Sequence, residues 1–159
     1  MRPANQTIGQ DVIAVLRADH RSVERMLSRF ESVDAEDRSE WFDQLRNVLV
    51  RHEAAEEQAV YPAVVDGTSG EQVLAGLLAE QAEVHDLIAR LETVNSGTDD
   101  FESGFVMLRG AVVDHARREE RSIFTLIERD KSEEERSEMG RHYERAMHGA
   151  ESHPTRPAG

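Results

Sequence analysis

Hydrophobic residues recur at helical spacing along most of the chain, and the alternation typical of strands is nearly absent. Apolar side chains three and four positions apart share one face of an α-helix, so this repeat predicts amphipathic helices. Short polar residues followed three positions later by Glu or Gln mark helix starts, because the two side chains cap each other's backbone amides. Together these signals predict helices over residues 9–31, 39–65, 70–94, 100–129 and 132–149.

The expected caps and connections predict how these helices pack. The capping pairs are Thr7/Gln10, Asp37/Glu40, Thr68/Glu71, Asp99/Glu102 and Ser132/Glu135. Pro62 lies inside the second helix and should kink or end it, because proline has no amide hydrogen. Long helices joined by short loops favour antiparallel neighbours. We therefore expect an all-α, up-down-up-down four-helix bundle with a fifth short C-terminal helix. Its domain should span residues 1–150, with a core at 11–129 and an extra helix near 132–149, and residues 151–159 should form a disordered tail.

The chain repeats itself, which supports two copies of one helical hairpin. When the second predicted helix is laid over the fourth, His52 falls on His115 and Glu56 falls on Glu119. The first and third helices align in the same way, with residues 11–31 over 72–92 and apolar positions on apolar positions. Two such hairpins predict a bundle with approximate two-fold symmetry.

Several polar residues occupy positions that the helical period assigns to the core. They are His20, His52, Glu56, Gln81, His85, His115 and Glu119. A single His–Glu pair one turn apart is common on helix surfaces, where it contributes only about 0.2–0.5 kcal/mol. Several ionisable groups on four facing helices are different, because buried charges are normally paired or bound to a metal. The cluster therefore predicts a metal site. By contrast, His142, His148 and His153 have polar neighbours and should be exposed.

Composition narrows the function further. The chain has 159 residues and a formal net charge of −13, which argues against nucleic-acid and anionic-membrane partners because those need clustered Lys and Arg. It has no cysteine, so a metal would need nitrogen and oxygen ligands. The first residues show no apolar run typical of a signal peptide, and no segment is long and apolar enough to span a bilayer. A cytoplasmic location is expected, and no obligate protein partner is evident.

These motifs resemble the hemerythrin-like, or HHE, family across residues 11–129. The resemblance rests on an upstream histidine, on "HEAAEE" followed by "YP", and on "HARREE" followed by "IF". It implies two non-haem iron ions inside the bundle, joined by an oxo or hydroxo bridge. Carried over by position, His20, His52, His85 and His115 would be terminal nitrogen ligands, and Glu56 and Glu119 would be bridging carboxylates. Imidazole and carboxylate suit iron or manganese, while zinc is harder to exclude.

The third helix departs from the family pattern. Hemerythrins have an HxxxH pair where this chain has Gln81 and His85. The repeat places Gln81 opposite His20, and Glu24 opposite His85, so Glu24 is an extra ligand, a hydrogen-bond acceptor for a ligand, or a surface residue.

Three functions remain open at this point. Six protein ligands leave positions free on two octahedral ions, so the first is binding of dioxygen or nitric oxide. The second is an enzyme that consumes hydrogen peroxide or nitric oxide. The third, iron or oxygen sensing, is the weakest because no output domain is attached.

Overall fold

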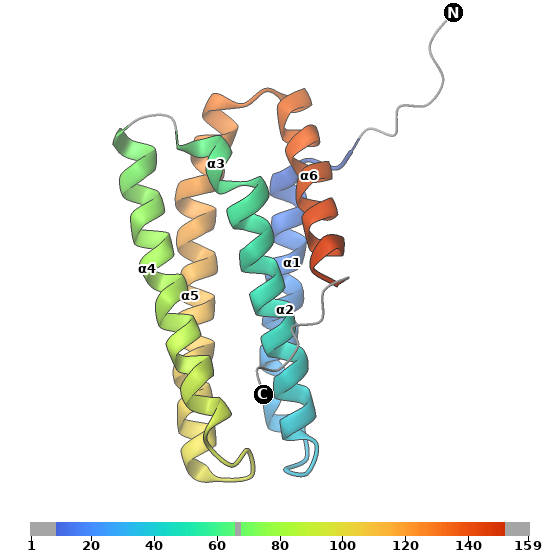
Figure 1. Cartoon of the computed structure of the whole chain (residues 1–159), viewed down its shortest axis with the longest axis vertical. Helices are drawn as coiled ribbons and strands as arrows, with labels where there is room; N and C mark the ends of the chain where they lie inside the picture. Colours follow the sequence, from blue (N-terminus) through green and yellow to red (C-terminus); the bar gives the residue numbers. More distant parts are fainter. Residues whose placement is uncertain (1–8, 66–67, 152–159) are drawn as a thin grey trace, which may run out of the picture.

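The computed structural model describes residues 9–65 and 68–151, and its regular elements are helices. They are α1 (Val12–Ser28), the short 3-10 helix η1 (Phe30–Ser32), α2 (Arg38–Ala59), α3 (Tyr61–Val64), α4 (Thr68–Glu92), α5 (Asp99–Asp130) and α6 (Glu133–Glu151). No strand occurs among the described residues. The predicted all-α architecture is confirmed: α1, α2, α4 and α5 form the four-helix bundle, and α6 is the added C-terminal helix (Figure 1).

Capping explains where several helices begin. Ser132 and Glu135 form the predicted reciprocal pair: the Glu135 amide donates to Ser132 Oγ over 3.2 Å, and the Ser132 amide donates to Glu135 Oε2 over 2.7 Å. Two other helices begin with a capping residue that the sequence analysis did not name. Asp11 caps α1 by accepting from the Ile13 amide, whereas Thr7 lies outside the described residues. Thr98 caps α5 in place of Asp99, because its hydroxyl accepts from the Phe101 amide.

Pro62 ends the second helix as predicted. The last turn of α2 closes at Ala59, and Pro62 falls in the first turn of the four-residue helix α3. Proline is tolerated there because the first amide groups of a helix need no partner within it. The break redirects the chain and places the neighbouring Tyr61 inside the bundle, where it is 3% exposed.

The core consists of two apolar clusters at different heights along the bundle. One contains Leu16, Tyr61, Phe124 and Tyr143, among others, and the other is an aromatic group that includes Phe30, Trp41, Phe42, Phe101 and Phe105. The Phe30 and Phe105 rings stack with centroids 4.1 Å apart. Burying each such side chain stabilises the fold by roughly 1.5–3 kcal/mol. The polar positions of the sequence fall between these clusters.

Helix α6, at the C-terminal end of the described chain, covers one side of the bundle. In Figure 1, α6 runs beside α1 and α2, while α4 lies along α5 on the opposite side. His142 and His148 on α6 are exposed, as predicted, whereas His153 and most of the predicted tail lie outside the described residues. Within the described residues, no helix is both long enough and apolar enough to cross a membrane.

Candidate metal centre

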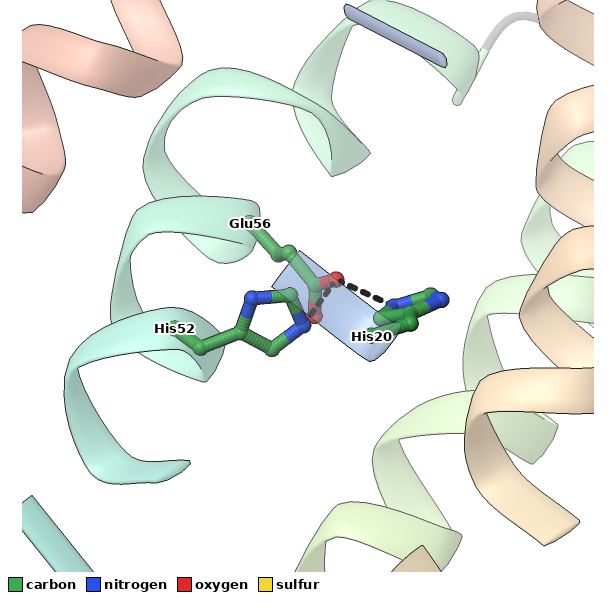
Figure 2. Close-up of side chains that lie close together, drawn as sticks. All are labelled: His20, His52 and Glu56. Carbon is green, nitrogen blue, oxygen red and sulfur yellow. Dashed lines mark ion pairs between the residues drawn. The ribbon is translucent and has the colours of Figure 1, made fainter. Parts of the chain in front are cut away.

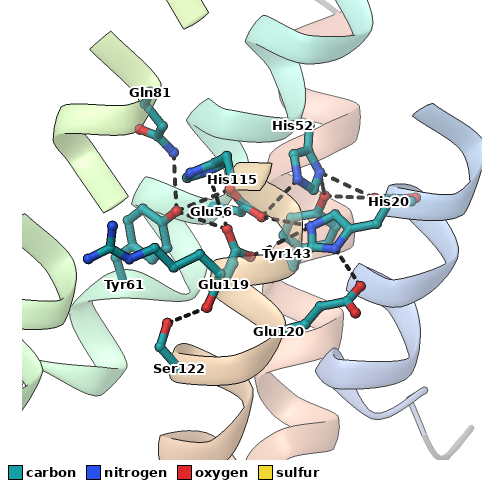
Figure 3. Close-up of polar contacts among 12 residues, drawn as sticks. His20, His52, Glu56, Tyr61, Gln81, His115, Glu119, Glu120, Ser122 and Tyr143 are labelled. Atoms are coloured by element: carbon teal, nitrogen blue, oxygen red, sulfur yellow. Dashed lines mark hydrogen bonds and ion pairs between the residues drawn. The ribbon is translucent and has the colours of Figure 1, made fainter. Parts of the chain in front are cut away.

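Five buried side chains from three helices meet between the two apolar clusters. His20 comes from α1, His52 and Glu56 from α2, and His115 and Glu119 from α5. They form two groups, His20–His52–Glu56 and Glu56–His115–Glu119, in each of which the nitrogen and oxygen atoms lie within 4.8 Å of one another. Glu56 belongs to both groups (Figures 2 and 3). The spacing of four residues in α2 and in α5 puts each His–Glu pair on one inward face.

The inward atoms of this cluster lack protein partners that would satisfy them. Glu56 Oε1, Glu119 Oε1 and His115 Nε2 are buried without a hydrogen-bond partner. Glu56 Oε1 lies 2.8 Å from His52 Nε2 and 3.7 Å from His20 Nε2, but neither nitrogen directs a well-aligned hydrogen bond at it. Leaving a buried polar group unpaired costs about 1–3 kcal/mol, more when it is charged. Two carboxylate oxygens and inward ring nitrogens at these separations therefore fit metal ions.

The outward ring nitrogen of each histidine is held by another side chain. His20 Nδ1 lies 2.9 Å from Glu120 Oε1, and His115 Nδ1 lies 3.0 Å from Glu80 Oε2. Arg118 donates to the other oxygen of Glu80 over 2.7 Å. Such contacts set the ring orientation and the tautomer, leaving the Nε2 lone pair for a metal.

The third histidine has the same arrangement, with a tyrosine as its partner. His52 Nδ1 lies 2.7 Å from the Tyr143 hydroxyl, which comes from α6. The sequence analysis assigned no role to Tyr143, because no spacing rule relates the last helix to the second.

Tyr61 faces the carboxylates from the side of α3 and α4. Its hydroxyl lies 3.1 Å from Glu119 Oε2 and 3.4 Å from Glu56 Oε2, and the amide of Gln81 donates to it over 3.2 Å (Figure 3). Gln81 is buried opposite His20, as the repeat predicts, but it contacts Tyr61 and not the carboxylates. The "YP" pair signalled the helix break, whereas the position of the tyrosine depends on that break and could not be predicted from helical spacing.

The structure does not bring His85 into the cluster. Its side chain is 53% exposed and pairs with Glu53 of α2, which is buried. Four residues rotate a helix by slightly more than one full turn, so His85 sits nearer the bundle surface than Gln81, and Glu53 holds it there. Five of the six predicted ligands therefore meet, all of them from α1, α2 and α5, without a histidine from α4.

A small cavity adjoins the three clustered histidines. It measures about 20 Å³, enough for one water-sized molecule. Apolar side chains form much of its wall: Val23, Leu49, Val84, Val112, Val113 and Ala116. Glu24 and Glu53 also line it, so Glu24, though exposed, borders the site without joining either metal-binding group.

The buried charges shift one another strongly in the metal-free protein. Burial lowers the pKa of His52, but the negative charge of Glu56 and the contacts with Asp19 and Glu56 outweigh it, so that pKa is raised well above its usual value. Burial, followed by the charge of Glu56, raises the pKa of Glu119 well above its usual value. Burial is also the largest influence on Glu53, whose pKa is raised to about 7 despite the opposing contacts with His85. These shifts favour the protonated forms of His52 and Glu119, so a metal ion at the centre would compete with protons.

Residues 11–127 match the model of a family described as the hemerythrin HHE cation-binding domain. The chain belongs to this family. The family resemblance drawn from the motifs is thus confirmed, and all five clustered residues of this hemerythrin-like chain lie within the matched range. Helix α6 lies outside it.

One relative of this hemerythrin-like chain carries a functional name. A protein from Nostoc sp. named DNA nickase is 29% identical over 133 residues, which cover 83% of this chain and 38% of that relative. The chain therefore spans well under half the length of this relative. No solved structure matches the chain.

Proposed function

We propose that this chain is a non-haem di-iron protein that binds small oxygen-containing ligands, with dioxygen and nitric oxide as the first candidates. His20, His52 and His115 would be the nitrogen ligands, and Glu56 and Glu119 would be the carboxylates between the irons. The observation that supports this most strongly is the pair of adjoining groups that share Glu56 and aim unpartnered buried atoms at one another. Three imidazoles and two carboxylates suit iron or manganese.

The donor count favours an open centre. The sequence predicted six ligands, and five of them meet in the structure. Tyr61 adds a further oxygen atom, 3.4 Å from Glu56 Oε2 and 3.1 Å from Glu119 Oε2, that could serve as a ligand. Two six-coordinate ions cannot be filled by these side chains, so bound iron would supply exchangeable positions and a change of oxidation state for ligand uptake.

The protein side chains around the centre would select the ligand by size and polarity. The adjoining cavity has room for about one water-sized molecule, so its size excludes large compounds, and apolar side chains form much of its wall beside the histidines, Glu24 and Glu53. The hydroxyl of Tyr61 stands beside the carboxylate pair, where it could donate a hydrogen bond to a bound ligand. These features favour diatomic gases and peroxide over larger substrates.

A second candidate is an enzyme that disposes of hydrogen peroxide or nitric oxide. The position of His85 favours it, because the loss of one expected nitrogen donor leaves a more open and weaker ligand set. In the peroxide case, two peroxide molecules would yield one dioxygen and two waters, so no outside reductant is needed. The hydroxyl of Tyr61, 3.1 Å from Glu119 Oε2, could hold or pass a proton beside the carboxylates.

The name of the Nostoc relative raises DNA as a substrate to be tested. The match covers 38% of that relative, and the present chain carries a net charge of −13, which repels a phosphate backbone. We therefore expect no nicking of supercoiled plasmid by the iron-loaded chain.

The proposal is tested by optical spectra of the anaerobically iron-loaded protein on separate addition of dioxygen, nitric oxide and hydrogen peroxide. A gas carrier should give a new absorption band that reverses when the gas is removed. The enzyme alternative predicts release of dioxygen from peroxide, recorded with an oxygen electrode, over many turnovers. An iron-loaded protein whose spectrum responds to none of the three ligands would contradict both candidates.

A further inference from the structure

Tyr143 lies on helix α6 and is in direct contact with the candidate centre. It is 1% exposed, and its ring meets the ring of His52 edge-on with centroids 6.1 Å apart. Its hydroxyl lies 2.7 Å from His52 Nδ1 (Figure 3). The same hydroxyl lies 2.6 Å from Asp19 Oδ2. Because α6 lies outside the range matched by the family model, membership of the family assigns this residue no role.

The two contacts of Tyr143 define the direction of both hydrogen bonds. A tyrosine hydroxyl has one proton, and a carboxylate only accepts, so the proton of Tyr143 is donated to Asp19. The contact with His52 must then be a donation from Nδ1–H to the tyrosine oxygen. His52 is thereby held with Nδ1 protonated and with Nε2 directed toward Glu56.

The internal repeat shows why a tyrosine is needed in this half of the bundle. The alignment of the first helix with the third places Asp19 on Glu80, and Glu80 reaches His115 Nδ1 directly over 3.0 Å. The side chain of Asp19 is one methylene shorter, and its Oδ2 stops 3.8 Å from His52 Nδ1. The hydroxyl of Tyr143 contacts both groups and bridges this gap.

We propose that Tyr143 is a positioning residue for the metal ligand His52, acting through an Asp19–Tyr143–His52 relay that makes α6 part of the metal centre. This inference rests on the proposed metal site. Asp19, 34% exposed, anchors the relay at the surface, and Tyr143 links its carboxylate to the imidazole without touching the metal. Partners of this kind typically alter metal affinity by about 10–100-fold when they are lost.

The test compares ferrous iron affinities, measured under anaerobic conditions by competition with a coloured chelator. Tyr143→Phe keeps the ring but removes the hydroxyl, so its affinity should fall about 10-fold or more. The double variant Asp19→Glu/Tyr143→Phe should regain most of that loss, because the longer carboxylate can reach His52 as Glu80 reaches His115. His142→Ala, an exposed neighbour on α6, is the control and should bind like the wild type.

Each outcome distinguishes the relay from the metal site itself. A wild-type protein that takes up no iron would contradict the proposed function and the relay with it. Wild-type affinity in Tyr143→Phe would overturn the relay alone. A loss that Asp19→Glu does not restore would reduce Tyr143 to a packing role and also overturn the relay. Circular dichroism of the metal-free variants checks folding. If Tyr143→Phe does not fold, Asp19→Ala interrupts the same relay from the surface, and unchanged affinity there would overturn it.

Discussion

Single residues at the centre were predictable wherever the helical period determined their face. His20, His52 and His115 sit on apolar seams of their helices, and the structure brings them together with Glu56 and Glu119. His85 shows the limit of that reasoning. Spacing places it near the inner face of α4, but a small rotation about the helix axis and a buried Glu53 decide that it faces outward.

Replacing one clustered histidine should remove metal, whereas replacing an exposed one should not. We expect His115→Ala to lose much of its iron, because it removes a proposed ligand whose Nε2 has no hydrogen-bond partner in the protein. His148→Ala on the exposed face of α6 is the matched control and should keep the wild-type iron content. Metal analysis of both purified proteins is the measurement. Equal iron in the two variants would contradict the placement of the centre.

Metal binding should release protons and should strengthen as pH rises. The negative charge of Glu56 raises the pKa of His52, and burial together with Glu56 raises the pKa of Glu119, so both groups favour their protonated forms more than usual and a metal ion would compete with those protons. Calorimetric titration with ferrous iron in buffers of different ionisation enthalpy counts the protons released. Heats that do not depend on the buffer, with affinity unchanged between about pH 6 and 8, would contradict ligation by these residues.

In the metal-free protein, by contrast, the contribution of these two groups to folding stability should fall as pH rises. The pKa of His52 is higher folded than its unfolded value of about 6.5, so its stabilisation is complete below that pH and is lost as pH rises through the folded pKa. The raised pKa of Glu119 acts in the same direction above the unfolded pKa of about 4.3. The gain in melting temperature on iron loading should therefore grow with pH, as measured by thermal unfolding of loaded and metal-free samples. A gain that shrinks with rising pH would contradict this.

The bounds of the long helices were predictable to within a few residues because a helical hydrophobic period sustained over many turns leaves few alternatives. The helix break at Pro62 was visible in the sequence, and the capping pair of Ser132 and Glu135 is present as expected. The side chains that α3 and α6 bring to the centre were not predictable. Tyr61 depends on how α3 leaves the axis of α2, and Tyr143 depends on α6 packing against α1 and α2. Both are products of tertiary packing, which local periodicity does not describe.

Removing Ser132, which caps α6 with a side-chain hydrogen bond, should destabilise the protein more than removing Asp37, which precedes α2 without such a bond. Ser132→Ala loses the hydroxyl half of the capping box and should cost about 1 kcal/mol, or roughly 2–4 °C in melting temperature. Asp37→Ala is the control, because the predicted cap at Asp37 makes no side-chain bond and its loss should cost less. Thermal unfolding of the two metal-free variants gives their melting temperatures. A larger drop in Asp37→Ala than in Ser132→Ala would refute the stabilising role of the Ser132 cap.

The whole molecule combines two apolar clusters with a polar layer between them. The clusters bury the apolar side chains, whereas the layer gathers buried polar groups, some of which have no hydrogen-bond partner and therefore oppose folding. A cation bound among these groups would offset that cost and so stabilise the folded bundle. Its internal repeat supplies two nearly equivalent His–Glu pairs, while Gln81 and Tyr143 make the two halves differ.

Filling the centre should raise the stability of the whole bundle. A metal that binds only the folded state, at a free concentration about 100 times its Kd, stabilises that state by about 2.7 kcal/mol. For a chain of this size, that is a rise of roughly 5–10 °C in melting temperature. Removing iron with a strong chelator should reverse the rise. Identical melting curves for loaded and chelator-treated protein would show that the ions are not bound at a folded site.

The number of iron ions per chain tests the central claim most directly. Anaerobic reconstitution with ferrous iron, removal of unbound metal and elemental analysis against protein concentration give this ratio. Two adjoining groups that share Glu56 predict about two irons per chain, and His115→Ala should leave at most about one. A wild-type ratio at or below about one, unchanged when more iron is supplied, would contradict the di-iron centre.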